Sequence, residues 1–316
     1  MTETVEFSPF PGSHRLADLA RRVPHAAWPS MVLAALQTFL FVGLGYHDFR
    51  NIAIWVIPTL LPVAVIVGRR DAWKSARLVM IGAILWGSAV AVAQVFGMAW
   101  PQLGGDVGMD TPADFVLRVG MRGASLIAIV APALVMLGLR SRRETQTSWP
   151  RALVAIAIVV TAVLCVLSVK QALDSQALQN NFGYYIDISL RDRLDAIAQG
   201  LETLGLLTMG ALAWSAVSAV RAQEEPRRFW LAIGAGSSLL FATDLYGRLG
   251  FPGAGGGFGP IDWPAIASLS AAIGEIRILA VLAGFILLLI GFGLGLPDSD
   301  EELLGDVLPE GAATPA

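Results

Sequence analysis

Seven charged side chains within or beside long apolar stretches are the residues best placed to do chemistry: Arg118, Arg122, Glu202, Asp244, Arg248, Glu275 and Arg277. Three are carboxylates and four are guanidiniums, so pairing among them leaves one positive charge over. Guanidinium groups bind carboxylate and phosphate oxygens in a bidentate manner, so such a cluster would suit an anionic solute or a lipid headgroup. The alternatives are structural. The charges could form an ion-pair belt that holds helices together, or the arginines could reach the headgroups as anchors, as for Arg118, Arg248 and Arg277.

Catalytic and cofactor motifs are absent from the sequence. The histidines His14, His25 and His47 lie outside the long apolar stretches, so they cannot hold a haem between membrane helices. The single cysteine, Cys165, excludes an intrachain disulfide and a cysteine metal cluster. There is no zinc-protease, serine-hydrolase or nucleotide-binding motif. We therefore expect no cofactor, no metal and no nucleic acid partner, and we favour a protein that is not an enzyme, with catalysis as an open alternative.

The composition is that of a helical membrane protein. The chain has 316 residues, of which 55% are hydrophobic and 15% are charged, whereas soluble domains contain about 25% charged residues. Only two of the 22 basic residues are lysines, a bias typical of GC-rich bacterial genes. We predict an all-α, polytopic integral membrane protein of the bacterial plasma membrane, with the lipid bilayer as its surroundings.

Eight apolar stretches define the expected membrane domain, residues 27–296. The predicted spans are residues 27–46, 52–68, 78–100, 115–139, 152–169, 201–220, 229–249 and 278–296. Their lengths approach or exceed the roughly 17–25 residues that cross a hydrocarbon core of about 30 Å. The shortest span contains Pro58 and Pro62, so we expect a broken helix there, with non-helical backbone near the middle of the membrane.

Three segments are expected outside the membrane. Residues 1–26 are polar, and no cleavage site follows the first span, so we interpret that span as a retained anchor and not as a signal peptide. Residues 171–200 should form an extracytoplasmic helical segment, because polar residues recur there at helical spacing up to Glu202, and span six should therefore begin early. Residues 297–316 are acidic and contain no basic residue, which predicts a disordered cytoplasmic tail.

The distribution of arginine and lysine predicts the orientation. Fourteen basic residues lie in the segments on one side of the predicted spans and five on the other, with three more at or inside span ends. Loops rich in lysine and arginine stay in the cytoplasm. Both termini are therefore expected to be cytoplasmic.

The depth of the charges follows from the rise of an α-helix, about 1.5 Å per residue. Counted from the span ends, Arg122 lies about 3 Å and Asp244 about 6 Å inside the outer boundary, and Glu202 lies just inside it. Short carboxylate side chains cannot reach the headgroups, so Glu202 and Asp244 should face the helix bundle. We predict that Arg122, Glu202, Asp244 and Glu275 meet in one cluster in the outer third of the membrane.

The two halves of the chain share a pattern that suggests duplication. A Trp-Pro pair opens both the first and the fifth span, at Trp28 and Trp149, and an arginine near the outer face begins both the fourth and the eighth, at Arg122 and Arg277. Two parallel four-helix repeats related by rotation about the membrane normal would explain this pattern. The alternative is that two hydrophobic halves align by chance.

Three functions remain open from the sequence. The first, which we favour, is a transport or translocation component with an outward-facing polar site, in which the proline-broken helix supplies non-helical backbone. The second is a non-catalytic membrane subunit or sensor that binds a membrane protein partner through its acidic tail and a glycine face, Gly291, Gly293 and Gly295. The third is a membrane enzyme that acts on a lipid-linked substrate, with Glu202 or Asp244 as general base.

The orientation can be tested with single cysteines at Ser141 and Gly256 in a Cys165→Ser background. A membrane-impermeant thiol reagent should label the cysteine at 256 in intact cells and the cysteine at 141 only after permeabilisation, because the arginine-rich loops face the cytoplasm. The Cys165→Ser protein alone should not be labelled. Equal labelling of both cysteines from outside would contradict the eight-span topology.

Overall fold

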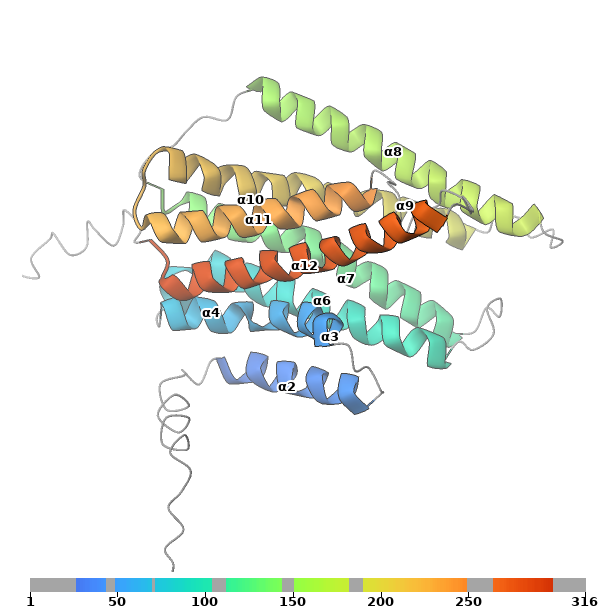
Figure 1. The fold of residues 1–316 in the computed structure, drawn as a ribbon, viewed down its shortest axis with the longest axis horizontal. Coiled ribbons are helices and arrows are strands. Elements are labelled where there is room, and N and C mark those ends of the chain that lie inside the picture. The colour runs from blue at the N-terminus through green and yellow to red at the C-terminus, as the bar shows by residue number, and fades with distance from the viewer. Residues whose placement is uncertain are drawn as a thin grey trace, which may run out of the picture.

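The computed structural model describes residues 27–43, 49–69, 72–103, 112–143, 151–181, 190–248 and 264–297, and every element within them is a helix. In chain order the helices are α2 (Trp28–Gly43), α3 (Phe49–Val56), the 3-10 turn η2 (Ile57–Leu60), α4 (Leu61–Gly68), α5 (Ala72–Ser75), α6 (Arg77–Leu103), α7 (Pro112–Arg140), α8 (Arg151–Asn181), α9 (Leu190–Leu201), α10 (Leu204–Arg221), α11 (Arg227–Arg248) and α12 (Pro264–Leu294) (Figure 1). A helix pairs its backbone N–H and C=O groups within one segment, as hydrocarbon surroundings require. The predicted all-α class is confirmed.

Five helical stretches of the described residues are long and apolar enough to cross a membrane: Val119–Arg140, Arg151–Lys170, Ala196–Arg221, Arg227–Gly247 and Ala272–Leu294. Three further apolar stretches are shorter: Trp28–Gly43, Ile52–Gly68 and Arg77–Ala93. These helices fit a membrane-embedded protein. The count of eight spans, the side of the termini and the repeat stay predictions, and residues 1–26 and nearly all of 297–316 lie outside the described residues.

Two pairs of helices cross with almost no side chain between their backbones. A Cβ atom at Gly236 of α11 would lie 2.7 Å from the carbonyl oxygen of Gly284 in α12. A Cβ atom at Gly82 of α6 would lie 2.9 Å from the carbonyl oxygen of Ala131 in α7. Small residues allow such close approach, which is the main source of helix packing where lipid removes the hydrophobic driving force. These crossings form the centre of the bundle.

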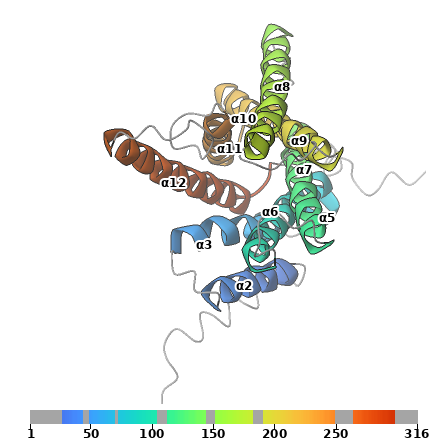
Figure 2. The ribbon, with the colours of Figure 1, turned by 90° about the vertical axis from the view of Figure 1, so that its right-hand side faces the viewer.

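The first helix of each half of the chain lies at the edge of the molecule. Figures 1 and 2 show α2 and α8 on opposite sides of the central helices. In α8 only 11% of the stretch Arg151–Lys170 is buried, although its mean hydropathy of 3.0 is the highest among the long stretches. In α2 the buried residues are Ala34, Gln37 and Phe41. Both helices therefore offer most of their apolar surface to their surroundings.

The helix between α2 and α6 is broken at the prolines, as the sequence predicts. Pro58 and Pro62 are the second residues of η2 and α4, in the first turn of each helix, where the missing N–H costs no helical hydrogen bond. The Thr59 hydroxyl donates a hydrogen bond of 2.7 Å to the carbonyl oxygen of Val56. Gly87 of α6 packs directly against this break, because a Cβ atom there would lie 2.8 Å from the Pro58 carbonyl oxygen.

A second irregularity lies just before α10, within the stretch Ala196–Arg221. Residues Glu202 and Thr203 form a turn between α9 and α10. The Thr203 hydroxyl is buried and donates a hydrogen bond of 2.6 Å to the carbonyl oxygen of Gly200. This bond competes with the backbone for a helical acceptor, which is why threonine favours turns over helix interiors. The turn carries Glu202, so it sets the position of that carboxylate.

Replacing Gly236 with alanine should lower the melting temperature in detergent by a few degrees. The added methyl group would collide with the backbone of α12, and such overpacking costs about 1–3 kcal/mol. The matched control is Gly293→Ala on α12, because a Cβ atom at Gly293 meets nothing within 4 Å. Equal melting temperatures for the two variants would show that the close crossing of α11 and α12 is wrong.

Candidate functional site

Ion pairs join α7 and α10 at both ends of these helices. We call the two ends of the bundle the Glu202 end and the Arg143 end, after one residue of each pair. At the Glu202 end, Arg122 Nη1 donates a hydrogen bond of 2.9 Å to Glu202 Oε1, with 30% and 15% of the two side chains exposed. At the Arg143 end, Arg143 Nη2 lies 3.0 Å from Glu224 Oε1, with only 5% and 3% exposed. The two helices therefore run in the same direction, and only the pair at the Glu202 end is accessible.

The spacing of the two pairs matches the thickness of a membrane. Arg122 and Arg143 are 21 residues apart, and Glu202 and Glu224 are 22 residues apart. At a helical rise of about 1.5 Å these separations are about 32 Å, close to the hydrocarbon core of about 30 Å. Each ion pair thus lies at the depth where a buried charge needs a partner.

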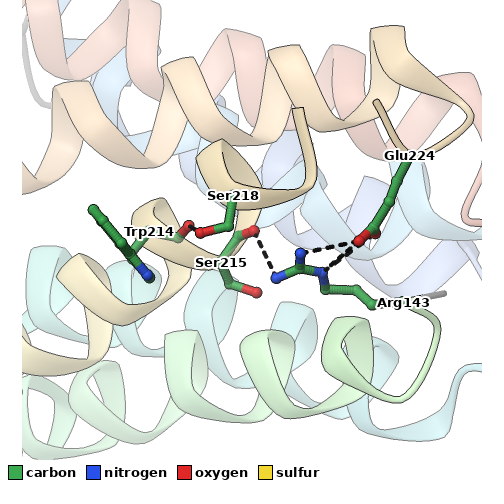
Figure 3. Close-up of polar contacts among 5 residues, drawn as sticks. All are labelled: Arg143, Trp214, Ser215, Ser218 and Glu224. Carbon is green, nitrogen blue, oxygen red and sulfur yellow. Dashed lines mark hydrogen bonds and ion pairs between the residues drawn. The ribbon is translucent and has the colours of Figure 1, made fainter. Parts of the chain in front are cut away.

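The turn after α10 positions Glu224 for its arginine (Figure 3). Gln223 adopts a left-handed conformation with φ of 59°, its N–H donates to Val220, and the Glu224 N–H donates 3.0 Å to the carbonyl oxygen of Ala219. This is the Schellman pattern of helix ends, which turns the chain back toward the last helical turn. Arg143 completes the arrangement, because its Nη1 donates a hydrogen bond of 3.2 Å to the carbonyl oxygen of Ser215.

The adjacent residue, Arg142, binds in a different direction. Its guanidinium donates hydrogen bonds to the carbonyl oxygens of Pro297, after α12, and of Ser75, at the end of α5. Arg142 and Arg143 are 4% and 7% exposed. In the sequence, both arginines were interpreted only as loop residues that indicate the cytoplasmic side, and their burial was not predicted. The overlooked signal was Glu224, a carboxylate directly after an apolar span on the side rich in arginine.

A cavity of about 320 Å³ lies among α6, α7, α10, α11 and α12 at the Glu202 end. Its lining residues are Trp86, Ser125, Ala128, Ile129, Pro132, Glu202, Gly205, Met209, Leu240, Thr243, Asp244, Arg277, Val281 and Phe285. This volume falls within the range of roughly 300–1,000 Å³ that is usual for small-molecule sites.

The lining changes from charged to apolar along three of the segments around the cavity. From the Glu202 end inward, the turn before α10 and α10 itself contribute Glu202, Gly205 and Met209, and α12 contributes Arg277, Val281 and Phe285. On α11 the order is Asp244, Thr243 and Leu240, because that helix runs in the opposite direction. Residues three or four apart share one helical face, so each helix presents a single row to the cavity. The cavity therefore has a charged mouth and an apolar floor.

Gly247 leaves the space that Arg277 occupies at the mouth. A Cβ atom at Gly247 would lie 2.7 Å from Nη2 of Arg277. Gly247 is three residues from Asp244, so the guanidinium packs against α11 within one turn of that carboxylate. A larger side chain at this position would force the Arg277 guanidinium to shift.

The predicted site residues divide into three groups. Glu202, Asp244 and Arg277 line the cavity, and Arg122 contacts it through Glu202. Glu275 is exposed and does not line it. The side chains of two other predicted residues, Arg118 and Arg248, lie outside the described residues. Among the described side chains, the carboxylates of Glu202 and Asp244 and the guanidinium of Arg277 line the mouth, and the Arg122 guanidinium binds Glu202.

Similarity to known proteins does not indicate a function for this chain. Comparisons with models of known protein families, with curated proteins and with solved structures find no match. Within the described residues there is also no group of three or more His, Cys, Asp or Glu side chains that could hold a metal ion. The cavity at the Glu202 end and the helices around it are therefore the features that bear on function.

Replacing Glu224 with glutamine should lower the melting temperature in detergent by roughly 6 °C or more. The change keeps the shape of the side chain but leaves Arg143 buried without its counter-ion, which costs about 3–5 kcal/mol, and about 1 kcal/mol moves the melting temperature of a large domain by about 2–4 °C. Adding Arg143→Met should recover part of the loss, because the buried charge is then removed. The control is Glu225→Gln, because Glu225 is exposed; an equal effect of Glu224→Gln and Glu225→Gln would argue against the buried pair.

Proposed function

We propose that the protein is a transport or translocation component of a bacterial membrane and that its cavity binds the polar headgroup of a zwitterionic lipid. The observation that carries this proposal is the charged mouth and apolar floor of the cavity at the Glu202 end. A ligand with a polar head and an apolar body matches that change in lining. In this proposal the head lies beside Asp244, Glu202 and Arg277, and the apolar part reaches toward Met209 and Phe285.

The balance of charge at the mouth favours a headgroup that carries both signs. Arg277 would bind a phosphate group, because guanidinium groups match phosphate oxygens. Asp244 and Glu202 would attract an ammonium group, and they would repel a bare anion. The anionic solute that the sequence count suggested is therefore the second candidate, and phosphatidylethanolamine has the headgroup chemistry that the mouth fits best.

The same proposal includes eight spans, both termini in the cytoplasm and two parallel halves. Support for the halves comes from the peripheral positions of α2 and α8, which each follow a Trp-Pro pair or contain one. Further support comes from the glycine crossings, which join α6 to α7 in the first half and α11 to α12 in the second. In this arrangement the cavity lies between the halves, where transporters built from repeats bind their substrates.

Binding can be tested by thermal stabilisation of the purified protein in detergent with three probes. Phosphatidylethanolamine and the soluble headgroup glycerophosphoethanolamine should both raise the melting temperature, and inorganic phosphate should not, because a ligand that binds only the folded state stabilises it. The lipid should act at lower concentration than the soluble headgroup, because its chains also bury apolar surface.

The variants Asp244→Asn and Arg277→Gln should each weaken this stabilisation about tenfold, because a hydrogen bond to a charged group contributes about 1.5–3 kcal/mol. Glu275→Gln is the matched control, since Glu275 lies on the same helix as Arg277 but is exposed and does not line the cavity. Stabilisation by inorganic phosphate alone would favour an anionic solute, and no response to any probe would refute the proposal.

A further inference from the structure

A second cavity of about 660 Å³ forms a groove between α8 on one side and α10 and α11 on the other. Its lining is almost entirely apolar: Leu153, Val154, Ala157, Ile158, Val160, Thr161, Leu164, Leu206, Leu207, Gly210, Ala211, Ala213, Trp214, Val217, Ser238, Phe241 and Leu245. No acidic or basic residue is among them, so the groove has no part in the charged mouth at the Glu202 end. Its occupant must be apolar over the whole length of the groove.

The groove is narrow at the Glu202 end and opens toward the Arg143 end. At the narrow end α8 is held against α9, because a Cβ atom at Gly200 would lie 2.3 Å from Val169 Cγ2 and 3.2 Å from the carbonyl oxygen of Cys165. Toward Arg151, where α8 begins, the helix diverges from α10 (Figure 1). The groove between them is therefore a wedge, and its wide end lies at the level of Trp214 and Val217.

The dimensions of the groove match one lipid chain. On α8 the lining extends from Leu153 to Leu164, and on α10 from Leu206 to Val217, which is twelve residues or eleven helical steps in each case. Eleven helical steps rise about 16 Å, and one leaflet fills half of a hydrocarbon core of about 30 Å. A transmembrane helix, by contrast, is a cylinder about 10 Å wide and 30 Å long with a volume of about 2,400 Å³, which exceeds the groove several times.

The wide end of the groove carries positive charge. Arg221 lies with its guanidinium carbon 6.0 Å from the ring centre of Trp214, which lines the groove. Both Arg221 and Arg151, at the start of α8, are exposed. The nearby carboxylates have other partners, since Glu224 binds Arg143 and Glu225 accepts a hydrogen bond from the Arg227 N–H. Tryptophan and arginine at one level are typical of the headgroup region, where each basic residue attracts anionic lipid.

We propose that this groove binds one acyl chain of an anionic phospholipid, with the lipid phosphate beside Arg221 at the Arg143 end. The chain fills the wedge between α8 and α10, and the phosphate neutralises the charge at its mouth. The bound lipid fixes the angle of α8, which packs closely against α9 at Gly200. This site is independent of the headgroup site proposed at the Glu202 end, and the two lie on opposite sides of α10.

The test uses native mass spectrometry of the full-length protein with phosphatidylglycerol and phosphatidylcholine of identical chains. The wild-type protein should bind one phosphatidylglycerol at least fivefold more tightly than phosphatidylcholine. Arg221→Gln should remove most of this preference, whereas Arg193→Gln, at an exposed arginine of α9, should keep it. Loss of the preference in neither variant or equally in both would overturn the role of Arg221.

Filling the groove with a larger side chain tests whether an acyl chain of the lipid occupies it. Ala157→Trp places an indole in the groove and should abolish the tight binding of phosphatidylglycerol. Ala155→Trp, on the same helix but outside the lining, should leave this binding intact. Stabilisation by glycerophosphoethanolamine at the other end should be unchanged in both variants, so failure here leaves the proposed function standing. Retention of the lipid by the Ala157→Trp variant would refute the proposal. So would a dimeric wild-type protein that becomes monomeric in this variant, because the occupant of the groove would then be a second copy of the protein.

Discussion

A charge that enters hydrocarbon needs a partner at the same depth, and this requirement shapes the contact between α7 and α10. The two helices meet through an arginine of α7 and a glutamate beside α10 at each end, with about one membrane thickness between the pairs. Neither helix can shift along the other by a turn without separating both pairs. Among the described helices, α6 and α9 also contact α7, and α8 and α11 also contact α10.

The two ends of the bundle differ in how completely the charges are enclosed. At the Arg143 end, two consecutive arginines bind four separate segments: α5, the turn after α10, the backbone of α10 and the residue after α12. At the Glu202 end the partly exposed pair of Arg122 and Glu202 borders a cavity. The bundle is therefore closed at one end and has room for a ligand at the other, which is the asymmetry that a protein with access from one side needs.

Depth along a helix was predictable from the sequence, whereas direction around the helix was only partly so. Counting residues predicted one cluster of Arg122, Glu202, Asp244 and Glu275; in the structure Glu202 and Asp244 line one cavity with Arg277, and Arg122 binds Glu202. The count placed Glu275 in this cluster, but residues two apart on a helix point in nearly opposite directions, so Glu275 and Arg277 cannot share a face. The break at Pro58 was predictable because proline removes a backbone donor. The pairing of Arg143 with Glu224 was not, because it joins residues 81 positions apart and depends on which helices are neighbours.

The apolar floor of the cavity has a consequence for the permeability of the membrane. Below the charged residues the lining is mostly apolar and includes Met209, Leu240, Val281 and Phe285. Apolar walls offer water few hydrogen-bonding partners, and hydrophobic constrictions exclude liquid water and ions. A recess of this kind, set in one face of a bilayer, would leave the electrical seal of the membrane intact.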